Sequence, residues 1–398
     1  MNEQVTLEMI ADAAKALNGV AQKTPIVSAC KISPNVFFKA ENLQKTGSFK
    51  IRGAYNKIRN LTDEEAARGV IACSAGNHAQ GVAVSATRRG IKSTICMPED
   101  APLMKVEATK NYGANVVLVP GSYDDAAKEA ARLSQEEGYT FIHPFDDPYV
   151  IAGQGSLGLE ILQQVPDVEQ IIVPIGGGGL ISGVALAVKA LKPKCKIIGV
   201  QAKRVASMNS SIEADHIVTI PNAKTVADGL HVLTPGQITF EMVKKYVDQI
   251  VTVDEDEICA AELNLLEGPK LVAEGAGATT LAAFLYAGID QSRKTVCIVS
   301  GGNVDTTTME KIFTRGLNKT GRLFKITVCI NDTAAKLSDL IATIASVGVG
   351  SIDFRRDQLI DTPDVNTCDI NLAIETTGFD QIEKVKQALR DKNYEFTE

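Results

Sequence analysis

Short apolar runs alternate with stretches of helical spacing along the first three quarters of the chain. One block covers roughly residues 69–145, and the same rhythm resumes between about residues 170 and 300. The predicted strands are 70–72, 93–96, 115–119, 170–175, 196–200 and 295–300, and the predicted helices include 77–89, 103–112 and one that begins at Leu180. Strand, helix, strand at this spacing is typical of a parallel sheet with helices on its faces. The pattern therefore predicts an α/β protein with two open lobes.

The pattern changes near residues 315–322, where two glycines and several polar residues indicate a linker. Alternating apolar residues and helical spacing follow, in the order β-α-β-β-α with a short final strand. The strands expected there are 323–330, 351–354, 367–375 and 394–396. This order of elements is ferredoxin-like.

These patterns predict two regions. The first covers residues 1–320 and contains a smaller lobe, roughly residues 52–147, inserted in a larger lobe. The second is an α+β domain over residues 322–398. A chain of 398 residues exceeds the usual size of one domain, so a division of this kind is expected.

Composition excludes several classes of partner. The chain is 45% hydrophobic and 22% charged, and its net charge of −7 argues against nucleic acid or an anionic membrane as a partner. The longest uncharged run, residues 275–289, is too short and too rich in Gly and Thr to span a bilayer. The first residues lack the basic and apolar regions of a signal peptide. We therefore expect a cytoplasmic protein.

The cysteines and histidines do not form a metal-binding pattern. Eight cysteines are scattered without a CxxC pair, mostly within apolar runs, which indicates reduced core residues. The four histidines form neither a catalytic triad nor a ligand set. No metal site is expected.

One lysine stands out. Lys50 lies among small residues and one aromatic, Phe49, just before a predicted helix start. An exposed lysine is an inert solvated cation, and most lysines are of this kind. A partly desolvated lysine instead has a lowered pKa and can form a Schiff base with a carbonyl. This stretch alone leaves both interpretations open.

Three polar or glycine-rich stretches follow predicted strands. They are SAGNHAQG (residues 74–81), GGGGL (residues 176–180) and SGGN (residues 300–303). Ligands of open α/β folds bind at the carboxyl ends of the strands. Glycine-rich backbone at a helix start can surround a phosphate with N–H groups. Three such stretches beside one lysine are best explained by a single phosphorylated ligand that carries an aldehyde.

These motifs carry a family resemblance. With GSFKIRGA (residues 47–54), ADG (227–229) and EGAG (274–277), the chain resembles pyridoxal-phosphate enzymes of the threonine dehydratase and serine racemase group. The motifs span nearly all of residues 1–320, and within the group they are most similar to those of threonine ammonia-lyases. The resemblance implies a tryptophan-synthase-like catalytic region (fold type II), with pyridoxal 5'-phosphate as the cofactor.

The resemblance also implies residue roles. Lys50 would be the Schiff-base lysine and the base for the Cα proton. The other expected cofactor contacts are Phe49 beside the ring, Asn77 on the ring hydroxyl, Ser300 on the pyridine nitrogen, and Gly176, Gly177, Gly178, Gly179 and Leu180 on the phosphate. The substrate carboxylate would be bound by Ser74, Ala75, Gly76 and His78. The implied reaction is deamination of L-threonine, and of L-serine, by β-elimination of water. The products would be 2-oxobutanoate or pyruvate, with ammonia.

Two other functions stay open: an amino-acid racemase on the same scaffold, and a catalytically silent amino-acid sensor. Related racemases use a serine hydroxyl at the position of Ala75, and alanine has no proton to give. Relatives that bind a divalent metal have acidic residues where this chain has Gln201 and Ser207. Elimination without efficient racemisation, and without such a metal, is therefore expected.

Residues 153–158 read GQGSLG and match the GxGxxG fingerprint of dinucleotide-binding proteins. A lone match is a weak signal. The preceding residues 148–152 make a poor strand, and no acidic residue follows at the required distance. Close helix packing is the preferred explanation of these glycines.

The C-terminal domain resembles the ACT regulatory domains of amino-acid enzymes. The usual Pro-Gly after the first strand is replaced here by residues 333–336, TAAK. An amino-acid effector site and a dimerisation module are both open, since a fold does not fix a function. A homo-oligomer, dimer or tetramer, is expected.

Overall fold

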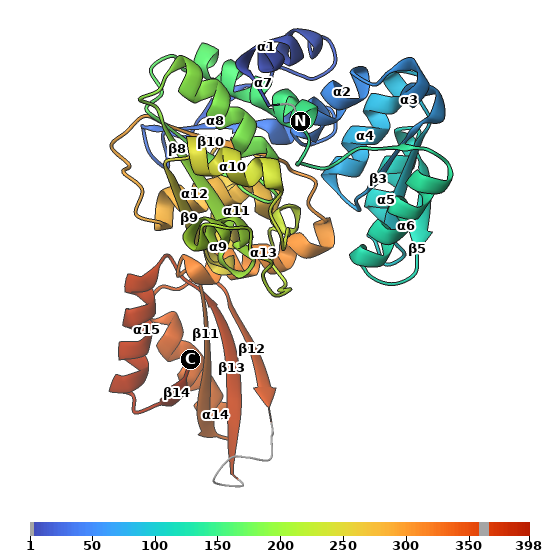
Figure 1. Cartoon of the computed structure of the whole chain (residues 1–398). Coiled ribbons are helices and arrows are strands. Elements are labelled where there is room, and N and C mark those ends of the chain that lie inside the picture. The colour runs from blue at the N-terminus through green and yellow to red at the C-terminus, as the bar shows by residue number, and fades with distance from the viewer. Residues whose placement is uncertain (1–3, 358–365) are drawn as a thin grey trace. The chain divides into compact units, whose positions relative to one another are not determined.

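The computed structural model describes residues 4–357 and 366–398, and the chain divides into two compact units, Met1–Met309 and Glu310–Glu398. Each unit is described by itself. The first unit has a larger and a smaller lobe, each built on its own sheet (Figure 1).

The larger lobe contains a six-stranded sheet in the order β1-β2-β10-β7-β8-β9, parallel except for the β1–β2 pair. Its strands are β1 (Ile26–Ser28), β2 (Val36–Ala40), β7 (Gln170–Pro174), β8 (Lys196–Ala202), β9 (Gln249–Val253) and β10 (Thr295–Val299). Its helices are α1 (Leu7–Ala16), α7 (Pro148–Gln164), α8 (Gly179–Leu191), α9 (Ser207–Ala214), α10 (Gln237–Tyr246), α11 (Glu255–Glu267) and α12 (Gly275–Tyr286), with short 3₁₀ turns η1 (Glu41–Leu43), η2 (Lys203–Val205) and η3 (Asp228–Leu230). Helix α13 (Thr306–Lys319) begins in the first unit and continues into the second.

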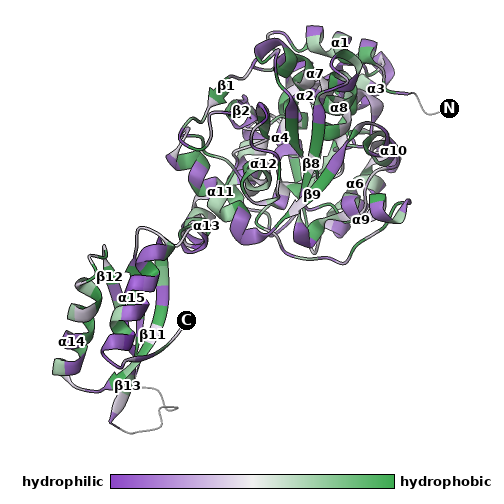
Figure 2. Ribbon diagram, turned by 90° about the vertical axis from the view of Figure 1, so that its left-hand side faces the viewer, coloured by the Kyte–Doolittle hydropathy of each residue, from purple (hydrophilic) through white to green (hydrophobic). Residues whose placement is uncertain are grey.

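Every residue of β7 and β10 is buried. Continuous apolar strands of this kind are typical of a parallel sheet covered on both faces. In Figure 2 the strand β8 is coloured as hydrophobic, whereas the helices around it carry hydrophilic residues. The core of the larger lobe therefore lies on both sides of this sheet.

The smaller lobe has a parallel four-stranded sheet in the order β5-β4-β3-β6. Its strands are β3 (Val70–Cys73), β4 (Ser93–Pro98), β5 (Asn115–Val119) and β6 (Thr140–Phe141), and its helices are α3 (Asp63–Arg68), α4 (Asn77–Arg88), α5 (Leu103–Asn111) and α6 (Tyr123–Glu136). Helix α2 (Lys50–Arg59) packs on α4 of this lobe and on α7 of the larger one. The α/β prediction is thus confirmed for both lobes.

Sheet order determines which strand ends meet. Strand β10 lies between β2 and β7 and runs parallel to both. The segment after β2 leads to Lys50, β10 is followed by Ser300, and β7 is followed shortly by Gly176. Three motifs that are far apart in the sequence therefore share one edge of the sheet.

The GxGxxG stretch lies inside helix α7, which begins at Pro148 after the cap Asp147. A Cβ added to Gly153 would lie 2.5 Å from the Arg52 carbonyl oxygen of α2. One added to Gly155 would lie 2.9 Å from the Gly183 carbonyl oxygen of α8. The preferred explanation, close helix packing, is confirmed.

The second unit contains an antiparallel sheet in the order β12-β13-β11-β14, with the connectivity β-α-β-β-α-β. Its elements are β11 (Leu323–Asn331), α14 (Ala334–Ala345), β12 (Ile352–Asp357), β13 (Thr367–Glu375), α15 (Phe379–Asp391) and β14 (Glu395–Thr397). The predicted linker over residues 315–322 is wrong in its first part, because α13 continues to Lys319. Its apolar residues, such as the buried Ile312, give this segment helical spacing.

Within the described part of the chain, no helix has the length and apolar character needed to cross a membrane. The same residues contain no group of three or more His, Cys, Asp and Glu side chains that could hold a metal ion. All eight cysteines are free thiols, and six of them are buried.

Candidate active site

Lys50 is the first residue of α2 and its amine lies near the end of β6. Its Nζ donates to the carbonyl oxygen of Pro144 at 3.0 Å and lies 5.4 Å from the ring centre of Phe49. Desolvation lowers the pKa of Lys50 to about 8, although the carboxyl of Glu274 opposes this shift. The desolvated alternative for this lysine is therefore the one that the structure supports.

The loop before Lys50 is joined to the end of β10. The backbone N–H of Phe49 donates to the Ser300 carbonyl at 3.0 Å, and that of Gly302 donates to the Gly47 carbonyl at 2.9 Å. An isolated antiparallel bridge also links Ser48 to Gly301. Ser300, with 2% exposure, is thereby held beside the start of α2.

The glycine stretch 176–179 connects β7 to α8. Gly178 caps the helix with φ of 96°, in the left-handed region that favours glycine. The hydroxyl of Thr239 donates to the Gly177 carbonyl at 2.7 Å and fixes the loop. Since the cap has no side chain, the N–H groups of the first turn of α8 face the site without a capping oxygen from Gly178. Leu180 follows in the helix and is buried.

Asn77, the first residue of α4, lies in a chain of side-chain hydrogen bonds. Its Nδ2 donates to Glu274 Oε1 at 2.7 Å, and its Oδ1 accepts from Asn303 Nδ2 at 2.7 Å. Burial, together with the neighbouring Asp228, raises the pKa of Glu274 to about 7. The close approach explains Gly301, where a Cβ would lie 2.4 Å from Glu274 Oε1.

The predicted substrate loop, residues 74–78, follows β3. Ser74 Oγ accepts from the Gly76 N–H at 3.2 Å, and Ala75 is partly buried against the core of the smaller lobe. His78 Nε2 lies 2.8 Å from the Ile142 carbonyl oxygen, so this nitrogen is the donor. Burial, together with the nearby Lys50, lowers the pKa of His78 to about 3. The His78 side chain is therefore neutral and is hydrogen-bonded to the backbone at Ile142.

The segment after β6 connects the lysine to the glycine loop. Pro144 accepts from Lys50, and the Phe145 ring lies against Gly177, where a Cβ would be 2.3 Å from ring atoms. Asp146 Oδ1 then accepts from the Thr239 N–H at 3.0 Å. Residues 144–146 therefore contact the amine, the glycine loop and the Thr239 that supports this loop.

Sequence reasoning missed several of these residues. Glu274 and Asn303 belonged to quoted motifs, yet neither was given a role. A signal was available, because Glu274 caps a helix and Asn303 follows a strand, and a carboxylate or amide beside glycines at such ends suggests polar contacts. No sequence signal marks the carbonyl of Pro144 or the hydroxyl of Thr239.

Comparisons with known proteins agree with this geometry. Residues 17–301 match the family model described as "Pyridoxal-phosphate dependent enzyme". An L-threonine ammonia-lyase of Thermotoga maritima is 44% identical over 395 residues, which is 98% of each chain. The catabolic L-threonine dehydratase TdcB of Escherichia coli K12 is 46% identical over 77% of this chain and 96% of its own.

Among solved structures, maize serine racemase superposes with a TM-score of 0.74 at 38% identity, covering 79% of this chain and 99% of its own. The family match covers more than half of the chain and includes Lys50, Asn77, the glycine loop and Ser300. The chain belongs to the family of pyridoxal-phosphate-dependent enzymes.

Proposed function

We propose that this protein is a threonine ammonia-lyase, which converts L-threonine to 2-oxobutanoate and ammonia and also accepts L-serine. The observation that carries the proposal is the desolvated Lys50 amine, placed where the ends of β2, β10 and β7 meet. The similarity to a named L-threonine ammonia-lyase over 98% of both chains supports the substrate.

The residues present fit pyridoxal phosphate. Lys50 has an amine with a lowered pKa, as covalent attachment to an aldehyde requires. Ser48 Oγ is buried beside it and has no hydrogen-bond partner within residues 4–357 and 366–398. An added Cβ at Gly76 would meet open space in the described part of the chain. An unpartnered hydroxyl, an uncapped helix start and free space are what a phosphorylated ligand needs.

We assign the cofactor contacts as follows. Lys50 carries the cofactor, and Phe49 lies beside the cofactor ring. Asn77 faces the ring hydroxyl and Ser300 faces the ring nitrogen. The phosphate is held by the loop of Gly176, Gly177, Gly178, Gly179 and Leu180. Asn77 keeps one N–H and one lone pair for this role, because Glu274 and Asn303 use only the others. The loop of Ser74, Ala75, Gly76 and His78 binds the substrate carboxylate through backbone N–H groups other than those of Ser74 and Gly76, which donate to the Cys96 carbonyl and to the Ser74 hydroxyl.

When bound, pyridoxal phosphate supplies the electron sink for negative charge at the substrate Cα. The free Lys50 amine accepts the Cα proton, since a pKa of about 8 places it near the working pH of a general base. Residues 74–78 orient the substrate by its carboxylate. Phe145 and Phe49 cover the site with apolar surface and exclude water.

One assay separates a lyase from a silent sensor. The purified protein should absorb visible light and release equal amounts of 2-oxobutanoate and ammonia from L-threonine. L-alanine, which lacks a β-hydroxyl, is the matched control and should yield neither. A yellow protein without 2-oxo acid would favour the sensor.

Similarity to maize serine racemase keeps racemisation as a second candidate. We expect pyruvate to form from L-serine far faster than D-serine, because Ala75 offers no proton on the face opposite Lys50. The variant Ala75→Ser should gain D-serine formation, measured by chiral chromatography. Ser74→Ala, which tests the neighbouring hydroxyl, should not change the ratio of the products. D-serine formed by the unmodified protein as fast as pyruvate would contradict the assignment.

We further propose that the second unit is an ACT-like domain that senses an amino acid. It lies outside the family match, has the ferredoxin-like connectivity and encloses its own apolar core. A hollow of about 480 Å³ on its sheet is lined by Lys325, Asp353 and Arg355, among other residues. Charges of both signs suit a zwitterionic amino acid.

In the full chain, isoleucine or valine should shift the dependence of the deamination rate on threonine concentration. The coupling free energy between effector and substrate should be about 1–3 kcal/mol. A version that ends at Gly321 should lose this response and keep its catalytic rate. Arg355→Gln in the full chain is a second test, with the exposed Arg132→Gln as its control. If the curves of rate against threonine concentration are identical with and without the amino acid in every stable form of the protein, only the dimerisation alternative is left.

Eight free thiols are consistent with a reducing compartment, and we propose a cytoplasmic location. We also propose a homodimer or homotetramer.

A further inference from the structure

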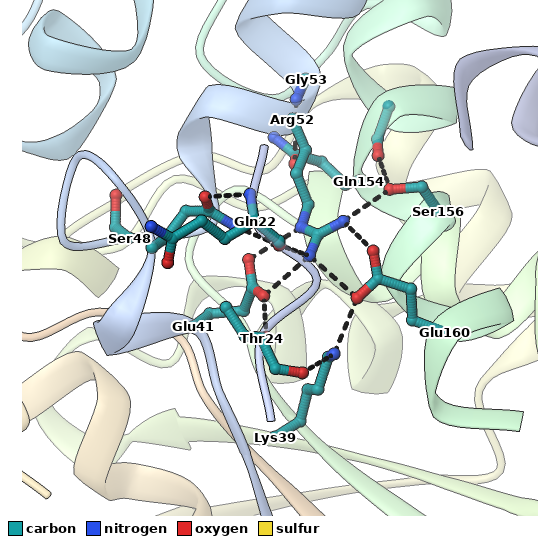
Figure 3. A network of polar contacts seen from close by, with 12 residues as sticks. Gln22, Thr24, Lys39, Glu41, Ser48, Arg52, Gly53, Gln154, Ser156 and Glu160 are labelled. Carbon is teal, nitrogen blue, oxygen red and sulfur yellow. Dashed lines mark hydrogen bonds and ion pairs between the residues drawn. The ribbon is translucent and has the colours of Figure 1, made fainter. Parts of the chain in front are cut away.

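Four charged residues form a buried network behind Lys50, which we call the buried charge network: Lys39, Glu41, Arg52 and Glu160 (Figure 3). Lys39 and Glu41 are 0% exposed and Arg52 is 1% exposed, whereas the Glu160 side chain, at the edge of the network, is 18% exposed. Two cations face two carboxylates, so the formal charges cancel. Buried ions of this kind persist only when each is paired and hydrogen-bonded.

Arg52 uses its whole guanidinium in this network. Its Nε and Nη2 donate to Glu41 at 2.8 and 2.9 Å, and its Nη1 and Nη2 donate to Glu160 at 2.7 and 3.1 Å. The Ser156 hydroxyl and the Gln22 carbonyl accept further bonds at 3.2 Å each. A planar fork with two bidentate partners fixes an orientation that a lysine cannot reproduce.

The network joins several elements. Lys39 of β2 donates to Glu160 Oε2 at 2.7 Å and to the Thr24 carbonyl at 2.7 Å. The Thr24 hydroxyl donates to Glu41 Oε1 at 2.5 Å. Glu160 belongs to α7 and Arg52 to α2. Helix α2 is thus tied to strand β2 and to helix α7.

Arg52 is linked to the site because it lies in the same first turn of α2 as Lys50. Lys50 and Arg52 are two residues apart, so at 100° per residue they lie on nearly opposite faces of the helix. Both are cations in the first turn, where the helix dipole favours anions. The cap Phe49 has no oxygen on its side chain to bind the first N–H groups. Contacts on the Arg52 side therefore add to the Phe49–Ser300 backbone bond in holding this turn in place.

Helix α7 packs against α2 and α8, the two helices whose first turns form the site. Through Gly153 it contacts α2, where an added Cβ would lie 2.7 Å from Gly53 Cα. Through Gly155 it contacts α8, where a Cβ added to Gly183 would lie 2.6 Å from the Gly155 nitrogen. Lys50 starts α2 and the glycine loop leads into α8. The spacing between amine and loop therefore depends on how both helices are seated on α7.

We propose that Arg52 is a positioning residue for Lys50: clamped by Glu41 and Glu160 against α7, it fixes the first turn of α2 and thereby the place of the Lys50 amine. The proposal rests on the role proposed above for Lys50. Arg52 acts from the face of α2 opposite Lys50.

The test compares Arg52→Lys and Glu160→Gln with the control Arg59→Lys. Arg59 lies on the same helix and pairs with the carboxylate of Asp12, but at the end remote from Lys50. The first readout is the pH dependence of Lys50 labelling by an amine-specific reagent in the cofactor-free full chain, followed by peptide mass spectrometry. The second readout is kcat and KM for L-threonine, each determined in the holoenzyme.

We expect Arg52→Lys to raise the labelling pKa of Lys50 toward its ordinary value, because a loosened first turn admits water. Misplacement of a catalytic group by about 1 Å can cost 100-fold, so kcat should fall roughly 10-fold or more, with KM changed less. Glu160→Gln keeps the shape of the side chain and should have a smaller effect of the same kind. Arg59→Lys should change neither quantity.

A purely structural role would lower the melting temperature of both variants and leave the labelling pKa and kcat unchanged, which would overturn the proposal. If Arg52→Lys does not fold, Glu160→Gln carries the same test. Should the unmodified protein fail to deaminate threonine while the labelling shift still occurs, the positioning role stands and the proposed function fails.

Discussion

Lys50→Ala should abolish the deamination of L-threonine. The substitution removes the amine that attaches the cofactor and also the base that accepts the Cα proton, and a general base alone contributes roughly 10²–10⁴-fold. The protein should still fold. Since burial lowers the pKa of Lys50, the folded state disfavours its charge, and removing it should not reduce the free energy of unfolding. Turnover is measured as 2-oxobutanoate release, and folding by thermal unfolding.

Lys45→Ala is the matched control, because Lys45 lies in the same loop and is exposed. It should keep normal turnover. Near-normal turnover by Lys50→Ala would remove the lysine from the mechanism, whereas equal losses in both variants would indicate damage to the loop.

Gly178→Ala should release the cofactor. Gly178 has φ of 96°, and an added Cβ would lie 2.8 Å from Met208 Cε and 2.8 Å from Thr239 Cβ. A non-glycine residue in such a conformation costs about 1–3 kcal/mol, and movement of the loop turns its N–H groups away from the phosphate. The dissociation constant of pyridoxal phosphate should rise roughly 10- to 100-fold, measured by absorbance titration.

Gly90→Ala controls for backbone strain alone. Gly90 also has a positive φ, of 67°, but an added Cβ there meets open space in the described part of the chain. This variant should lose some stability and keep its cofactor affinity. If Gly178→Ala binds the cofactor as tightly as the unmodified protein, the glycine loop is not the phosphate site.

Motifs made of backbone features could be predicted from the sequence. The position of the glycine stretch after a strand follows from local pattern, as does that of Lys50 at a helix start. Contacts between distant side chains could not be predicted in this way. The bond from Asn77 to Glu274 joins residues 197 apart, and that from Asn303 to Asn77 joins residues 226 apart. They depend on sheet order, which places β10 between β2 and β7.

The direction in which a side chain points also could not be predicted from the sequence. The sequence places His78 in the substrate loop, yet its ring is directed to the Ile142 carbonyl. Likewise, glycines near residue 316 suggested a linker, although Gly316 is buried within α13. A glycine that allows close packing and one that ends a helix look alike in a single sequence.

The most direct test of the Lys50-centred site is borohydride reduction of the holoprotein followed by digestion and peptide mass spectrometry. Reduction makes the bond between lysine and cofactor permanent. We predict about one added cofactor mass per chain, located on the peptide that contains Lys50. Modification of a different lysine, or a cofactor that leaves every peptide unlabelled after reduction, would contradict the account.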